Sequence, residues 1–517
     1  MLLQSLLPSG SAGSEVTPEG FQTWLTTLPF DRPGIAAHAL VNEISRMRTS
    51  MAIRSRIKLL ETAVEPAQKL LVAGSAELAQ CSLPLSSELQ HTFGAVNALF
   101  KTLATSYAAI TDEIASKWVG IGFAKPRNLA TVRAMQFQAQ RLDLAYQVYA
   151  RGSNSSWTEL HRLYRIARDG GFAKNTEQEA GPTAEQIYLN ALLLNFAEPT
   201  KLPFGELDRV RSYVENHSNH AELIEANTNL PIDQSPDSCF LIKPLEARAG
   251  RSLLRAKSAS ISPCDLVLCC TRLQSKLKSQ LTDIENGLDP ETLGLPATAR
   301  QPQYVGMLRN LQRLWSLQTT RRFSRQNFKP RVDIVVGFDA LWSFLNAPAA
   351  QRRSTDEETT ETKSSLVLSE WAIGNESPSG FSLQYIGGNA GPVCVSEVIG
   401  LRPREQLNVV YVCATRRVVS GDQQSLELGL QKLAPIAKPV LARLIESNQQ
   451  VRAIMLPRMP GMSNSPALLV PKNSVTIGTR LSIPQAVKNG VQQVEYAVET
   501  LLEQGPSCEL YTVAQQG

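Results

Sequence analysis

The fold of the C-terminal half is indicated most clearly by WAIGNESPSGFSLQY, residues 371–385. Apolar residues alternate with small or polar ones after its central run, NESPSG, which spans residues 375–380. A period of two is typical of a strand with one buried face, and Asn, Pro, Ser and Gly are frequent in turns. The stretch therefore predicts two antiparallel strands joined by a tight turn.

The same period of two recurs around this hairpin, at residues 331–336, 409–413 and 426–431. Short alternating strands separated by turns favour a small antiparallel barrel. We predict a helix after the last of these strands, from Pro435 to Ser447. Further strand-like runs follow, between residues 451 and 513, and they form either a second small β unit or an extension of the first.

The first half of the chain has helical spacing instead. Leu40, Ile44, Met47 and Met51 step by four, three and four, and a second apolar stripe begins at Val132 and continues for about five turns. Such stripes bury one face of each helix against other helices. We predict six to eight helices here, one of which starts near residue 184, after Pro182 and Thr183, and stops before Pro199.

These patterns together predict an α+β multidomain protein. Its parts are an all-α domain over residues 20–216, a mixed connecting segment ending in helices over 217–316, a β-barrel over 317–447, and a C-terminal β-rich extension over 448–517. Residues 346–365 within the barrel domain are polar, charged and almost free of large apolar side chains. They cannot bury enough surface to offset the entropy of ordering, so we predict a disordered inserted loop.

Composition excludes several classes of function. The 52 Lys and Arg residues against 47 Asp and Glu give a net charge of +5, which is too mild for a protein that wraps nucleic acid. The N-terminus lacks the pattern of a signal peptide, and no run approaches the ~20 apolar residues that span a bilayer. We therefore predict a cytoplasmic protein without a membrane span.

Known catalytic and metal-binding motifs are missing from the sequence. It has no P-loop, HExxH, GxSxG or GxGxxG, its eight cysteines form no CxxC pair, and no histidine follows His220. We predict that the protein is not an enzyme and holds neither a metal nor a cofactor.

Two short motifs are candidates for ligand binding. The first is RRFSR, which places Arg321, Arg322 and Arg325 shortly before the first barrel strand. An arginine side chain has a planar fork of donors that suits phosphate oxygens and the guanine edge, and it can stack on a purine. Taken alone, the run is more typical of a solvated basic linker than of a ligand site.

The second motif is NxSxxG, formed by Asn375, Ser377 and Gly380 in the predicted hairpin. The first two offer short polar groups, and the glycine lets the backbone approach a ligand closely. Taken alone, it is compatible with an ordinary hairpin turn.

The order of these features resembles the PilZ family over roughly residues 317–444. An arginine-rich lead-in precedes a barrel strand, and NxSxxG, further strands, a closing strand with glycine and a helix follow. The long insert between the two motifs departs from the compact family pattern. A stretch beginning at Tyr188, YLNALLLNFAEPTKLPFGEL, is similar to larger bacterial proteins in which a helical region precedes a PilZ-like module.

The resemblance implies a receptor for cyclic di-GMP, with the three arginines, Asn375, Ser377 and Gly380 as ligand contacts. Ligand would order the RRFSR segment and reorient the helical half, which signals to an unidentified protein partner in motility, type IV pilus or biofilm control. A degenerate PilZ-like scaffold that binds a protein without nucleotide is the alternative. An RNA-binding barrel is disfavoured, because the barrel half lacks regularly spaced aromatic residues for base stacking.

Overall fold

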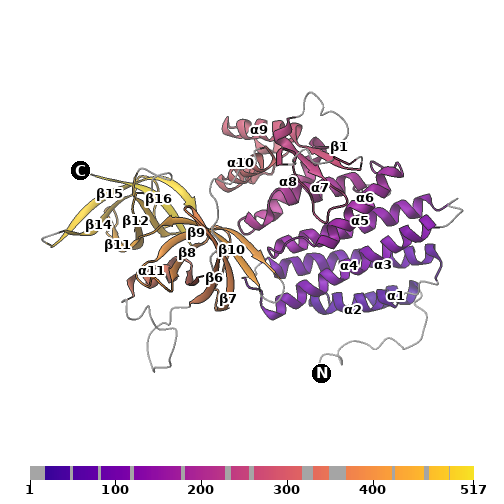
Figure 1. Cartoon of the computed structure of the whole chain (residues 1–517), viewed down its shortest axis with the longest axis horizontal. Coiled ribbons are helices and arrows are strands. Elements are labelled where there is room, and N and C mark those ends of the chain that lie inside the picture. The colour runs from indigo at the N-terminus through magenta and orange to yellow at the C-terminus, as the bar shows by residue number, and fades with distance from the viewer. Residues whose placement is uncertain are drawn as a thin grey trace, which may run out of the picture.

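The protein is seen here as a computed structural model. It describes residues 18–46, 51–79, 83–116, 122–175, 181–226, 235–255, 261–262, 264–316, 330–347, 368–421, 425–458, 465–487 and 490–516. Helices lie at one end of the molecule and two β-barrels at the other (Figure 1). The RRFSR motif and residues 348–365 of the predicted insert lie outside the described residues. The predicted fold class is confirmed.

Long packed helices form the N-terminal region. The predicted stripe lies on α5, where Val132, Met135 and Leu142 are buried, and Phe137 of the same helix contacts Phe100 and Tyr107 of α4. Each helix buries one apolar face in this shared core. In the described residues the helices are α1 (Pro18–Leu25), α2 (Pro33–Ser45), α3 (Ile53–Leu78), α4 (Ser87–Ser116), α5 (Ala124–Gln147), α6 (Asn154–Asp169), α7 (Ala184–Phe196) and α8 (Glu206–His217).

Helix α7 begins where the sequence predicts. The Thr183 hydroxyl accepts a hydrogen bond from the Gln186 amide at 3.1 Å, and Gln186 Oε1 accepts one from the Thr183 amide at 2.9 Å. This capping box satisfies two backbone donors that a helix start otherwise leaves without partners.

The connecting segment packs onto the helices as a small sheet and two further helices. Phe240 of β2 stacks on Phe196 of α7 with ring centres 4.0 Å apart. Trp315, near the end of α10, is fully buried and its Nε1 donates to the Leu193 carbonyl at 3.3 Å. The C-terminal end of α10 is therefore packed against, and hydrogen-bonded to, the helical region. The sheet has the order β1 (Glu222–Glu225), β4 (Leu266–Cys269), β2 (Cys239–Ile242), β3 (Arg251–Ser252), and the helices are α9 (Thr271–Glu285) and α10 (Pro302–Ser316).

The first barrel is closed and antiparallel, and in the described residues it has six strands. Alternate side chains point inward, and Trp371, Ile373, Phe381, Leu383 and Leu428 are buried there. The strand order is β10 (Leu426–Ala434), β7 (Gly380–Gly388), β6 (Ser369–Ser377), β5 (Arg331–Val336), β8 (Val398–Pro403), β9 (Tyr411–Ser420), with β9 returning to β10.

A second closed barrel follows directly, so the predicted helix over residues 435–447 is wrong. Residues Lys438–Leu444 form strand β11, which pairs with β12 from Lys438 to Arg443. The apolar residues here have helical spacing, but pairing with β12 overrides it and leaves Leu441 45% exposed. In the described part of this barrel the order is β11, β12 (Gln450–Leu456), β13 (Ala467–Pro471), β16 (Cys508–Gln515), β15 (Gly490–Gln504), β14 (Arg480–Val487).

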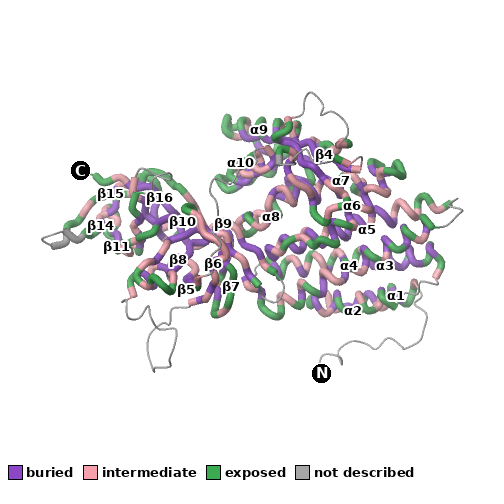
Figure 2. Tube along the Cα trace, viewed as in Figure 1, coloured by how far each residue is buried: buried purple, intermediate pink, exposed green. Residues whose placement is uncertain are grey.

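Helix α11 (Phe338–Asn346), which the sequence analysis missed, joins the two barrels. Phe338, Leu341 and Phe344 are buried in a cluster that includes Val412 of the first barrel and Ile454 of the second. In Figure 2, buried residues are drawn in purple in the strands of both barrels. A shared apolar core of this kind holds the two barrels together.

The first barrel also contacts the helical region, through strand β9. The Ser420 amide donates to the Tyr149 carbonyl at 3.0 Å, and Ala150 and Ser420 form a parallel bridge. Beside this contact is a cavity of about 640 Å³, lined by Phe93, Asn97 and other residues from both parts.

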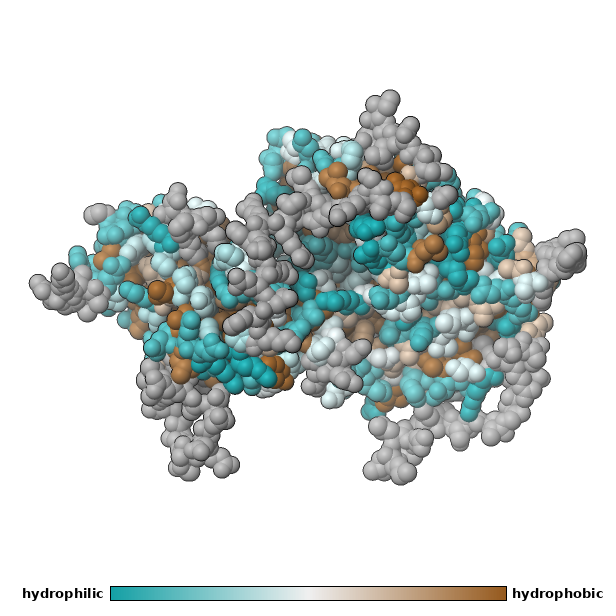
Figure 3. Space-filling model, viewed as in Figure 1, coloured by the Kyte–Doolittle hydropathy of each residue, from teal (hydrophilic) through white to brown (hydrophobic). Residues whose placement is uncertain are grey.

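No helix among the described residues is long and apolar enough to cross a membrane. On the face drawn in Figure 3, hydrophilic side chains cover much of both parts.

Candidate functional site

The NxSxxG residues lie at the predicted hairpin, between β6 and β7. Ser377 ends β6 and faces Gly380, which begins β7. The Ser377 hydroxyl donates to the Gly380 carbonyl at 3.3 Å. A Cβ at Gly380 would lie 2.0 Å from the Leu430 carbonyl oxygen of β10, so only glycine fits this position. Both residues therefore also build the turn itself.

Asn375 opens a row of residues on the outside of the barrel. It pairs with Ser382 on β7, Ser382 pairs with Gly429 on β10, and Gly429 pairs with Arg417 on β9. The neighbouring residues Phe381 and Leu383 point inward, so this row points outward. Three strand spacings of ~4.8 Å give the row a length of roughly 14 Å.

A second outer row lies beside the first, formed by Ser377, Gly380 and Gln431. Short side chains and glycines make the middle of this surface a shallow floor, and its members are all partly exposed. We call this surface the outer platform and define it by Asn375, Ser377, Gly380, Ser382, Arg417, Gly429 and Gln431.

Arginines stand at the β9 edge of the outer platform. Arg417 Nη2 donates to Glu427 Oε2 at 2.9 Å. Arg416 Nε donates to Gln431 Oε1 at 2.7 Å, and its Nη2 donates to Glu503 Oε2 of the second barrel at 2.7 Å. Arg416 thus connects the two barrels, whereas Arg417 lies at the end of the first row.

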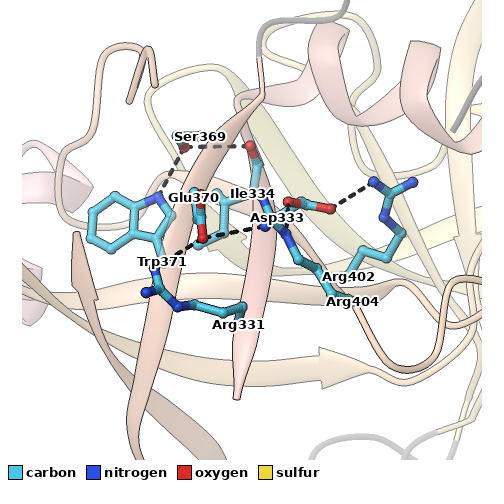
Figure 4. Close-up of polar contacts among 8 residues, drawn as sticks. All are labelled: Arg331, Asp333, Ile334, Ser369, Glu370, Trp371, Arg402 and Arg404. Carbon is cyan, nitrogen blue, oxygen red and sulfur yellow. Dashed lines mark hydrogen bonds and ion pairs between the residues drawn. The ribbon is translucent and has the colours of Figure 1, made fainter. Parts of the chain in front are cut away.

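A charged network occupies the other edge, on β5, β6 and β8 (Figure 4). Asp333 accepts from Arg402 at 2.7 Å and from Arg404 at 2.9 Å, and both Asp333 and Arg402 are almost fully buried. Arg404 also approaches Glu370 at 3.2 Å, and Glu370 accepts from Arg331 at 2.9 Å. Burial opposes the charge of Arg404, but hydrogen bonds and attraction from the two carboxylates outweigh it and raise its pKa.

This network has a structural role first, since it ties three strands together. Arg402 also lies over the Phe344 ring of α11, 5.1 Å from its centre. Arg331 and Arg404 remain partly exposed, and Arg331 pairs with Ala372, so it lies on the outer face two strands from Gln384. Arginines therefore lie on both sides of the outer platform, and each of them is paired with a carboxylate.

The arginine motif cannot be placed, because Arg321, Arg322 and Arg325 lie outside the described residues. The residues on either side of it are described. Trp315 is held on the helical region, and the Pro330 carbonyl accepts from the Ile373 amide at 3.0 Å. The chain thus enters the barrel beside β6, two residues from Asn375 along that strand.

Sequence reasoning missed Ser382 and Arg417 of the outer platform, and it noted Gly429 only as the glycine of the closing strand. Neither row is continuous in sequence, because its members come from several strands whose register the sequence does not specify. The available signals were the pair Arg416 and Arg417 after an alternating strand and the glycine of the closing strand, Gly429. Among the described residues, no group of three His, Cys, Asp or Glu side chains could hold a metal ion.

Fold and site together define a class of protein: a helical region joined to two β-barrels in tandem, the first with an NxSxxG hairpin and an outer surface flanked by arginines. Comparison with known proteins gives two matches. Residues 19–227 match the family model described as the N-terminal domain of the cyclic-di-GMP receptor FimW. The chain is also 22% identical over 555 aligned positions to the cyclic-di-GMP receptor FimW of Pseudomonas aeruginosa, across 91% of this chain and 86% of that protein.

Proposed function

We propose that the protein is a receptor for cyclic di-GMP that binds its ligand on the outer platform and has no catalytic activity. The observation that carries the proposal is the similarity to a cyclic-di-GMP receptor along 91% of the chain. The outer platform supports it separately. It is a surface of short polar side chains and glycines, roughly 14 Å long, with arginines on both sides that can bind phosphates and guanines.

The first barrel would then be a PilZ-like module. An RxxxR motif, a barrel strand and an NxSxxG hairpin occur in the order expected for that family. The strand that follows β10 departs from the pattern, since β11 belongs to the second barrel where a closing helix is expected. The departure falls after the binding motifs, so it leaves the proposed site intact.

The arginine motif is within reach of the outer platform. Arg325 stands five residues before Pro330, so their Cα atoms are at most about 17 Å apart. The Pro330 carbonyl itself accepts a hydrogen bond from the Ile373 amide of β6, two residues from Asn375. We expect Arg321, Arg322 and Arg325 to contact phosphates and guanines of a ligand that lies on Asn375 and Ser382.

The arginine motif also lies in the segment that joins the helical region to the first barrel. Ligand binding to this motif could therefore be transmitted to the helical region. A ligand that draws residues 317–329 onto the barrel changes the connection between Trp315 and Pro330. The helical region would then shift relative to the first barrel and alter its contact with a protein partner.

A protein scaffold that binds no nucleotide is the second candidate. It is favoured by the structural roles of Ser377 and Gly380 in the turn. Since the hairpin requires both residues for its own geometry, the motif would be present even in a protein that binds no ligand.

Isothermal titration of the full chain separates the two candidates. A receptor should bind cyclic di-GMP with micromolar or better affinity and should bind GTP and cyclic AMP much more weakly. Equal binding of all three nucleotides, or no heat at saturating cyclic di-GMP, would contradict the receptor.

A further inference from the structure

The outer platform is connected to the helical region by one carboxylate. Glu427 Oε2 accepts a hydrogen bond from Arg417 Nη2 at 2.9 Å and another from Arg151 Nη2 at 2.8 Å. Arg417 belongs to the first row of the outer platform, whereas Arg151 follows helix α5 of the helical region. Glu427 therefore lies between a candidate ligand surface and a second structural part.

Arg417 is well placed to meet a ligand on this surface. Its neighbour in the row is Gly429, which has no side chain that could cover it, and a Cβ there would lie 3.1 Å from the Arg417 Cβ. Its side chain is 37% exposed. The guanidinium has several donors, and a phosphate accepts two of them in parallel.

We propose that Arg417 is a further ligand-contacting residue, and that a phosphodiester of cyclic di-GMP competes with Glu427 for it. This inference rests on the proposed function and adds a residue outside both sequence motifs. When Arg417 turns to the phosphate, Glu427 keeps Arg151 as its counter-ion. Binding on the barrel thereby strengthens the ionic contact between Glu427 and the helical region.

The surroundings of the shared carboxylate allow such a change. Arg151 and Glu427 both line the cavity of about 640 Å³ at the junction, together with Ser420 and Asn97. Side chains there can rearrange while the backbone hydrogen bond from Ser420 to Tyr149 keeps the two parts in register.

The proposal predicts opposite effects for the three charged residues. In titrations of the full chain with cyclic di-GMP, Arg417→Gln should weaken binding by about ten- to a hundredfold, the loss of one charge-assisted contact. Glu427→Gln should tighten binding by roughly two- to fivefold, because it removes the competitor. Arg151→Gln should weaken binding by roughly two- to fivefold, because Glu427 loses Arg151 and then binds Arg417 more strongly. The small size of the effect is that expected for a partly exposed ion pair.

Two further variants keep the experiment interpretable. Arg417→Lys retains the charge but loses the fork, so its affinity should lie between those of the wild type and Arg417→Gln. Arg309→Gln removes another exposed arginine that pairs with a glutamate between elements, and its affinity should equal that of the wild type. Thermal unfolding of each variant shows whether it is folded.

Each outcome has a distinct meaning. If wild-type protein does not bind cyclic di-GMP, the proposed function fails and this inference fails with it. If the wild type binds and folded Arg417→Gln binds equally well, only the role of Arg417 is overturned. If Glu427→Gln weakens binding as Arg417→Gln does, Glu427 positions Arg417 for the ligand, and the competition between carboxylate and phosphate is wrong.

Discussion

An arginine can bind a phosphate by two parallel hydrogen bonds, so the loss of one such side chain should lower the affinity for a phosphate-containing ligand markedly. Arg321→Ala and Arg325→Ala should each weaken cyclic di-GMP binding by about 1–3 kcal/mol. Ser377→Ala should weaken it less, because a neutral hydroxyl makes the weaker bond. Isothermal titration measures these changes. Arg352→Ala, in the acidic predicted insert, is the control, and a loss of affinity there would point to a general charge effect.

The buried histidine His161 gives the helical region a pH-dependent stability. Its Nε2 lies 2.8 Å from the Arg248 carbonyl, which can only accept, so Nε2 carries the proton and Nδ1 accepts from the Tyr188 hydroxyl. Burial lowers the pKa of His161 below its usual 6.5. The unfolded chain therefore takes up this proton more readily, and stability falls as the pH drops below about 6.5.

Removing this titrating group should flatten the acid side of the stability curve. His161→Gln should lose less free energy of unfolding between about pH 7.5 and 5.5 than the wild type does. Urea unfolding at both pH values measures the difference. His38 is exposed on α2, and His38→Gln should lose as much as the wild type. Equal pH slopes for both variants would show that His161 titrates alike in the folded and unfolded chain.

The β6–β7 hairpin offers a comparison between two glycines of one strand. Gly380→Ala would place a Cβ against the Leu430 carbonyl, whereas a Cβ at Gly387 meets nothing within 4 Å. Gly380→Ala should therefore lower the free energy of unfolding by about 1–3 kcal/mol. Gly387→Ala should change it by less than about 0.5 kcal/mol. Similar unfolding curves for the two variants would mean that β7 and β10 separate easily at the turn.

The network on β5 contrasts a buried carboxylate with an exposed one. Asp333→Ala should cost about 3–5 kcal/mol of stability, because it leaves the buried Arg402 without its carboxylate partner. Glu370→Ala, which removes two partly exposed ion pairs, should cost no more than about 1 kcal/mol. Denaturant unfolding of both variants tests this ranking, and a reversed order would contradict it.

Elements were predictable where the local pattern and the fold agree. The stripe on α5, the Thr183 cap and the hairpin around residues 375–380 each carry their own signal within a few residues. The stretch 435–447 carried a helical spacing that cross-strand pairing with β12 overrode. Helix α11 was missed because its apolar face is explained by residues of both barrels, which lie far from it in sequence and against it in space.

At the scale of the whole molecule, the outer platform depends on which strands are neighbours. Asn375, Ser382, Gly429 and Arg417 lie within about fifty residues of one another in sequence, but only the order β6–β7–β10–β9 makes them a row. The sequence could identify Asn375 through its motif. It could not place Ser382 and Gly429 side by side, because an alternating strand offers small outward residues at many positions and the pairing register selects among them.

The connection between the two halves of the molecule can be tested with a protease. Residues 317–329 join Trp315, fixed on the helical region, to Pro330, fixed on β6. If cyclic di-GMP draws this segment onto the outer platform, its peptide bonds become less accessible to trypsin, which cuts after arginine. Cleavage after Arg321, Arg322 and Arg325 in the full chain should therefore slow at saturating cyclic di-GMP and remain unchanged with GTP. Cleavage elsewhere, for example after Arg352, provides the internal control within the same digest. Equal cleavage of the segment with and without ligand, in a protein that titration shows to bind cyclic di-GMP, would mean that the signal reaches the helical region by another route, such as Glu427 and Arg151.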